Sequence, residues 1–222
     1  MSAFTTGRTL DAAGEPIRGT GFEVERGSWL ADRLEERTGP ITSHPTRPVW
    51  GIPLDAPEDV VRTLSVFGAG YGGPPEHYHE RSPEVFDVKR GGLTVSLDGS
   101  ERRVEAGEAA TVETGVRHTF RNAGDERALV VTEIRSPGRL RSVLPTLGGL
   151  AHDDERDPDH PLQRAAIAKR LDGNTVFTES ESVPKPVVDA AGSVARLAGY
   201  RGAYATYAQP AFWRRHVEQP DT

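Results

Sequence analysis

Two histidines and a glutamate lie close together in the sequence with the spacing of metal ligands. The chain contains His77-Tyr78-His79 in a β-like segment, so both imidazoles are expected on one face of a strand. Glu84 follows after a four-residue gap with turn chemistry, and it can face the histidine pair from the next strand. A buried carboxylate beside two imidazoles is costly without a cation, and a divalent metal would supply one.

A third histidine completes this candidate set. His118 lies on one face of a separate expected strand, 117–122. The resulting ligands are His77, His79, Glu84 and His118, which suit a borderline divalent metal with positions left for water or substrate. We therefore expect one divalent transition metal per chain, with iron, manganese, nickel, zinc and copper all open.

Other motifs and histidines carry less weight. The stretch 68–73 matches the dinucleotide pattern G-x-G-x-x-G, but two prolines and a β-like run follow it instead of a helix. We therefore expect no nucleotide cofactor. The remaining histidines lie in polar or irregular segments and are expected at the surface: His44, His152, His160 and His216. No catalytic acid or base can be assigned, although Glu113 and Glu133 lie in late strands.

The spacing of the ligand set resembles the two motifs of the cupin superfamily. The first motif is His77-x-His79-x₄-Glu84-x₆-Gly91, and the second is Gly107-x₅-Glu113-x-Gly115-x₂-His118-x₃-Asn122. Glu113 stands where the family usually has proline, and Tyr71 where it usually has its first glycine. The resemblance covers residues 60–135 and is to single-domain, metal-binding cupins. It implies an antiparallel double-stranded β-helix, also called a jelly-roll barrel, with a metal held by residues similar to these four.

The elements expected around these residues agree with that class. Eight β-like runs fall between residues 60 and 135, and no helical pattern interrupts them. Leu93, Val95 and Leu97 alternate with polar residues, and Asp98-Gly99 then gives a strong hairpin signal. The expected fold is mainly β, with antiparallel strands.

The apolar period changes after Pro137. Leucines and valines at helical spacing predict a helix over 140–150, and further helices are expected at 161–171 and 187–207. We expect three parts along the chain. Residues 1–58 form an irregular or β arm packed on the barrel, 59–136 the cupin barrel, and 137–222 a helical C-terminal extension.

Composition limits the class of protein. The 222 residues carry a formal net charge of −6, include no cysteine and have a mean hydropathy of −0.53. We expect a cytoplasmic protein without disulfides, membrane spans or nucleic-acid partners. Edge strands, together with Phe212 and Trp213 near the C-terminus, favour a homodimer.

Three functions are compatible with this interpretation. The leading expectation is a metal-dependent oxidoreductase of the dioxygenase type that acts on a small organic molecule. The alternatives are a cupin that binds or senses a small molecule without turnover, and a metal-assisted isomerase or cyclase. Dioxygen uptake would separate the first from the other two.

Overall fold

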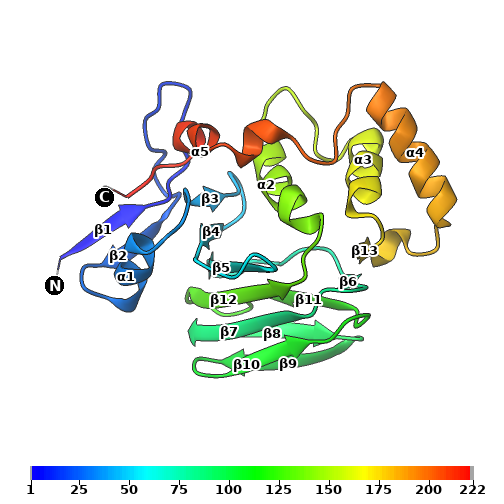
Figure 1. Cartoon of the computed structure of the whole chain (residues 1–222). Coiled ribbons are helices and arrows are strands. Elements are labelled where there is room, and N and C mark those ends of the chain that lie inside the picture. Colours follow the sequence, from blue (N-terminus) through cyan, green and yellow to red (C-terminus); the bar gives the residue numbers. More distant parts are fainter. Residues whose placement is uncertain (1, 221–222) are drawn as a thin grey trace.

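The central part of the protein consists of antiparallel sheets, as the sequence predicted. The structure is a computed structural model that describes residues 2–220 (Figure 1). The larger sheet has six strands, in the order β10 (Ala109–Val112), β7 (Glu84–Arg90), β12 (Ala128–Arg135), β5 (Val60–Phe67), β4 (Val49–Pro53) and β3 (Thr42–Ser43). The smaller sheet has five, in the order β13 (Thr175–Phe177), β6 (His77–His79), β11 (His118–Arg121), β8 (Gly92–Leu97) and β9 (Ser100–Glu105).

Apolar side chains on the inner faces of the two sheets form one core. The alternation predicted for β8 places Leu93 and Val95 in this core with Phe86 and Val88 of β7, and all four are fully buried. The hairpin predicted after β8 is present, with positive φ angles of 46° at Asp98 and 82° at Gly99. The expected fold class is therefore confirmed.

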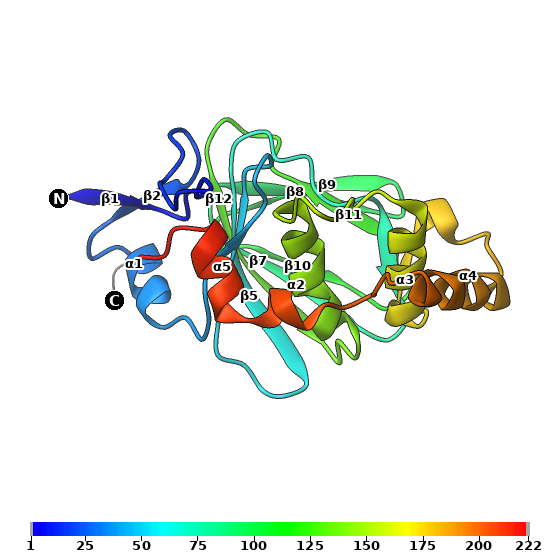
Figure 2. The same ribbon diagram turned by 90° about the horizontal axis from the view of Figure 1, so that it is seen from above.

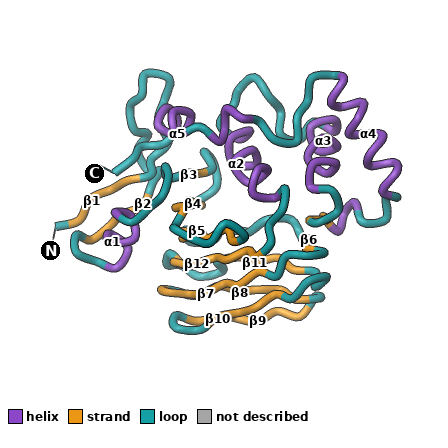
Figure 3. Tube along the Cα trace, viewed as in Figure 1, coloured by secondary structure: helices purple, strands orange, loops and turns teal. Residues whose placement is uncertain are grey.

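The regular helices lie almost entirely after β12 and cover one side of the sheets (Figures 2 and 3). They are α2 (Leu140–Ala151), α3 (Pro161–Leu171), α4 (Lys185–Leu197) and α5 (Pro210–His216). The third predicted helix, 187–207, is too long. It ends at Leu197, and Gly199 then takes a φ of 94°, which ends the helical path. None of the helices in residues 2–220 has the length and apolarity needed to span a bilayer.

The N-terminal and C-terminal segments of the described residues lie side by side. The N-terminal part forms a two-stranded sheet from β1 (Ala3–Thr6) and β2 (Phe22–Glu25), followed by α1 (Trp29–Glu35). Beyond β1, the Thr9 backbone pairs with that of Val217 in an antiparallel bridge. Arg8 Nε donates to Glu218 Oε2 over 2.7 Å. The C-terminal segment is thereby fixed to the N-terminal one (Figure 1).

A second core joins this N-terminal part to the helices, and it corrects two expectations. Phe212 and Trp213 were expected to lie at the surface and support a dimer. Both are buried, with 8% of Phe212 and 2% of Trp213 exposed. His152 was also expected at the surface. It is buried at the end of α2, with its ring 5.8 Å from that of Trp213. The helical segment after β12 buries these side chains within its own chain.

Candidate metal centre

The four predicted ligands come together between the two sheets. His77 and His79 share one face of β6, and His118 pairs with His77 from the neighbouring strand β11. Glu84 reaches the same point from β7 in the opposite sheet. All four side chains are buried, and each offers a ligand atom within 4.8 Å of the others.

Backbone carbonyls fix the orientation of two of these imidazoles. His77 Nδ1 lies 2.9 Å from the Pro75 carbonyl oxygen, and His118 Nδ1 lies 3.0 Å from that of Val116. A carbonyl oxygen only accepts, so each Nδ1 must carry the hydrogen. The Nε2 atoms are then left for another partner, which is the arrangement usual for metal-ligating histidines.

The third imidazole is held by a residue that sequence reasoning missed. His79 Nδ1 lies 2.9 Å from Thr175 Oγ1, and Thr175 belongs to β13, which pairs with β6. This strand is only three residues long and follows a helix in the sequence. Neither alternation nor a nearby turn signal could have indicated it, because its partner strand lies 96 residues earlier.

The carboxylate has an unusual electrostatic environment. Burial alone would raise the pKa of Glu84, but the hydrogen bond with His118 and the nearby His79 imidazole bring it below its ordinary value. His118 Nε2 lies 3.0 Å from Glu84 Oε2. His118 Nδ1 already carries a hydrogen and the lowered pKa of Glu84 keeps its carboxylate ionised, so this short contact needs a cation at the site. Either a second proton on His118 or a metal ion meets that requirement.

The remaining donor atoms also fit a metal ion. His79 Nε2 is buried and lacks a hydrogen-bond partner among the described residues, although Glu84 Oε2 lies 3.5 Å away. A buried polar atom without a partner is rare and calls for an explanation. Burial, with the adjacent imidazoles, lowers the pKa of His77 to about 4, so this ring is neutral near pH 7. Three imidazoles and a carboxylate could thus hold a divalent metal ion.

Other candidate residues do not join the cluster. Glu113 is exposed, and Glu133 forms an ion pair of 2.6 Å with Arg62. Asn122 of the second motif has a structural role, since its amide donates to the carbonyl oxygens of Phe67 and Gly68 over 3.0 Å each. No catalytic acid or base can be assigned from this geometry.

Comparison with known proteins identifies this part of the chain. Residues 63–134 match the family model of the cupin domain, so the chain contains a cupin domain that includes all four clustered residues. The cupin resemblance stated from the two motifs is therefore confirmed.

Similarity to individual proteins is confined to part of the chain. It is 36% identical over 83 residues to "Polyketide synthase CurC" of Streptomyces cyaneus, which is 37% of this chain and 49% of that protein. It is 41% identical over 59 residues to "Tetracenomycin polyketide synthase protein TcmJ" of Streptomyces glaucescens, which is 27% of this chain and 40% of that protein. The match thus spans half or less of either relative. Among solved structures, KdgF from Halomonas sp. is 20% identical, with a TM-score of 0.38 over 42% of this chain and 84% of that one.

Proposed function

We propose that this protein is a metal-dependent cupin enzyme that acts on an oxygen-rich small organic molecule. The observation that carries the proposal is the convergence of His77, His79, Glu84 and His118 within 4.8 Å, with an unpartnered Nε2 among them. When bound, a divalent metal would supply Lewis acidity toward substrate oxygens, and its identity remains open among iron, manganese, nickel, zinc and copper.

The relatives suggest the substrate class. Two are named as polyketide synthase proteins, and they match 83 and 59 residues of this chain. Polyketide chains carry several carbonyl oxygens, and neighbouring carbonyls can chelate a metal ion. A substrate of this type would therefore bring its oxygens to the four-residue cluster.

The reaction class that fits best is a metal-assisted cyclisation or isomerisation. In an aldol-type ring closure, a carbon beside one carbonyl bonds to the carbon of a second carbonyl, whose C=O π bond breaks. The proton lost from the first carbon ends on the oxygen of the second carbonyl, which becomes a hydroxyl group. This ring closure needs no oxidant or other co-reactant. The dioxygenase activity expected from the sequence has only the donor set in its favour, so it is the second candidate.

The chain's own residues have defined tasks in either reaction. The carbonyls of Pro75 and Val116 and the Thr175 hydroxyl hold the three imidazoles with Nε2 directed inward. The burial of all four ligands keeps water away from the reacting oxygens, which strengthens electrostatic interactions there.

Elemental analysis of the purified protein tests the metal site. We expect about one divalent metal per parent chain. His118→Ala should lower this content severalfold, whereas His216→Ala, on α5 outside the cluster, should keep it. Circular dichroism checks that both variants fold. Equal metal content in the two variants would show that the cluster is not the metal site.

Dioxygen consumption separates the reaction classes. The parent protein, loaded with iron, manganese or zinc, is incubated with the linear triketone heptane-2,4,6-trione in an oxygen electrode, beside a control with the metal and no protein. Conversion without oxygen uptake supports cyclisation or isomerisation, and stoichiometric uptake supports the dioxygenase. Binding without conversion would support the non-enzymatic cupin.

A further inference from the structure

A large cavity connects the candidate metal centre with the helix α2. It has a volume of about 1520 Å³, and its lining includes Glu84 of the four-residue cluster and Phe120 of β11. Pockets for drug-sized ligands usually measure about 300–1000 Å³. There is therefore room for a molecule of several rings that extends from the metal centre to α2.

One wall of the cavity is a patch of hydroxyl groups, hereafter the hydroxyl wall. It consists of Thr63 and Ser65 on β5 and Thr132 on β12, all half-buried. Thr63 and Thr132 are direct partners across the two strands, and Ser65 is two residues from Thr63 on the same face. The cluster residue Glu84 shares this face, because it pairs with Ile134, two residues from Thr132.

These hydroxyls are available to a ligand. The hydroxyl of the nearby Thr42 donates to the Gly51 carbonyl over 3.3 Å. The hydroxyls of Thr63, Ser65 and Thr132, by contrast, have no side-chain hydrogen bond to any of residues 2–220. Hydroxyl groups facing a cavity lose little by exchanging water for a ligand oxygen, because they can both donate and accept.

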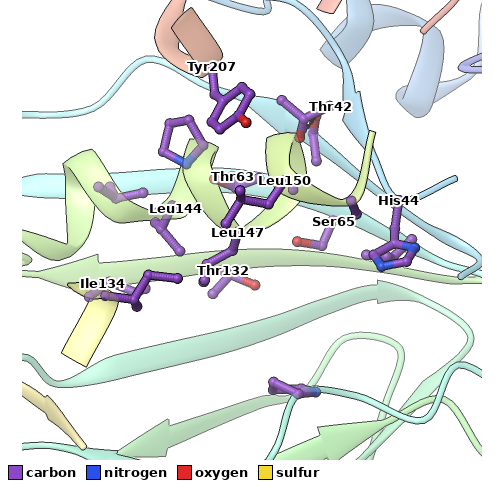
Figure 4. Close-up of a pocket in the computed structure, with 18 of the residues that line it drawn as sticks. Thr42, His44, Thr63, Ser65, Thr132, Ile134, Leu144, Leu147, Leu150 and Tyr207 are labelled. Carbon is purple, nitrogen blue, oxygen red and sulfur yellow. Dashed lines mark hydrogen bonds between the residues drawn. The ribbon is translucent and has the colours of Figure 1, made fainter. Parts of the chain in front are cut away.

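The opposite wall is aliphatic, hereafter the leucine wall. Leu144 and Leu147 extend from α2 toward the strands that carry the hydroxyl wall (Figure 4). Leu147 is 40% exposed, so a ligand in the cavity can reach its side chain. The five residues that form these two walls carry no charge, which favours an uncharged ring system between them. Charged side chains elsewhere in the lining include Arg47, Arg141 and Arg164.

We propose that the space between the hydroxyl wall and the leucine wall binds the flat, uncharged ring system of a molecule with several fused rings. Its oxygens lie along one edge against Thr63, Ser65 and Thr132, and its ring face packs on Leu144 and Leu147. One end reaches the four-residue cluster at Glu84. This inference rests on the proposed function for the role of the metal. It goes further by assigning substrate selection to α2, which lies outside residues 63–134 that match the cupin domain.

The probe for this site is 1,8-dihydroxyanthraquinone, which has three fused rings and three oxygens on one edge. Unsubstituted 9,10-anthraquinone, which lacks the two hydroxyl groups, is the comparison. Quenching of tryptophan fluorescence measures the Kd, since Trp50 lines the cavity. The full-length protein is treated with a chelator, so that coordination to a metal does not contribute.

Two matched pairs of variants test the two walls. Thr132→Val should weaken binding of the dihydroxy probe by about two- to tenfold, which is the range for one lost hydrogen bond, and should not change binding of anthraquinone. Thr111→Val, at an exposed position of β10, should change the binding of neither probe.

Leu147→Gln tests the leucine wall and should weaken the binding of both probes by about tenfold through lost apolar contact. Leu197→Gln, on α4 at an 89% exposed position, should weaken neither.

Each contrary result overturns the inference. It is wrong if the parent does not bind the dihydroxy probe below millimolar concentration, or if each variant behaves like its control. Equal affinity for the two anthraquinones would exclude recognition through the hydroxyl wall. Metal content is measured on protein from the same preparations before the chelator is added. Failed probe binding with full metal content contradicts only this inference, and intact probe binding without metal contradicts only the proposed function.

Discussion

At the scale of single residues, the candidate centre depends on the atoms behind the ligands as much as on the ligands themselves. Each of the three imidazoles has an oxygen partner at Nδ1, so only Nε2 is free to face Glu84. Thr175 is the only one of these partners that acts through its side chain. It can therefore be replaced without changing the backbone.

Replacing Thr175 should weaken metal binding while leaving all four ligands in place. Thr175→Val keeps the shape of the side chain but removes the oxygen at 2.9 Å from His79 Nδ1. Loss of such a supporting contact typically lowers metal affinity by about 10- to 100-fold. Thr175→Ser retains the hydroxyl and should bind metal like the parent. Competition with a chromogenic chelator measures the affinity, and equal affinities for the Val and Ser variants would contradict this role.

A buried histidine outside the candidate metal centre, His152, should make stability depend on pH. Burial lowers the pKa of His152 to about 4, despite the hydrogen bond to the Ser43 carbonyl over 3.0 Å. The folded state therefore holds the neutral ring, whereas the unfolded chain takes up a proton near pH 6.5. The free energy of unfolding should therefore fall by about 3 kcal/mol as the pH falls from 6.5 to 4, because only the unfolded chain takes up the proton.

Urea unfolding between pH 4 and pH 7 measures this effect. His77 also has a lowered pKa, so the test is the difference between the parent and His152→Gln. The free energy of unfolding of the variant should fall less across this range, because glutamine does not titrate. Parallel curves for the two proteins would show that His152 does not cause the loss.

At the scale of elements, the turn before β6 shows how closely the two motif strands fit together. Gly73 has a φ of 81°, and a Cβ atom there would lie 1.7 Å from the Phe120 carbonyl oxygen on β11. The neighbouring Gly72 has open space around its Cβ position and no positive φ. The glycine-rich stretch is thus not a flexible turn throughout, because Gly70 and Gly73 both have positive φ and Gly73 also has no room for a Cβ atom.

Gly73→Ala should therefore destabilise the protein by about 2 kcal/mol or more, through backbone strain and the clash with β11. Gly72→Ala should lie within about 0.5 kcal/mol of the parent. Thermal and urea unfolding of the two variants measure the difference. A Gly73→Ala protein as stable as Gly72→Ala would show that β11 moves away at little cost.

The sequence predicted the ligands and the strands around them because that information is local. His77, His79 and Glu84 lie within eight residues, and β8 alternates over consecutive positions. The features that the sequence did not predict depend on contacts between residues far apart in the chain. The strand β13 exists because β6 offers an open edge, and the buried position of His152 depends on Trp213, which follows it by 61 residues. Neither pairing has a signature within a short window of sequence.

At the scale of the whole molecule, the homodimer remains a prediction, but only one of the two features that supported it remains. Phe212 and Trp213 no longer support it, because they are buried within the chain. The edge strands β3, β9 and β10 still present unpaired backbone groups in the described part of the chain. We expect twice the 24.1 kDa chain mass by light scattering at micromolar concentration. A monomeric mass would contradict the prediction.

The pairing of β13 with β6 also has a consequence for the order in which the protein matures. The hydroxyl that orients His79 is synthesised 96 residues after that histidine. At ordinary translation rates of about 5–20 residues per second, this delay is roughly 5 to 20 s. The cupin motif strands can leave the ribosome and associate during that time, while the His79 ring still lacks its partner. The last of the four ligands, His118, still precedes Thr175 by 57 residues. The nascent chain therefore has all its metal ligands before it has the contact that orients His79, and high-affinity metal uptake should come as a late step of biogenesis.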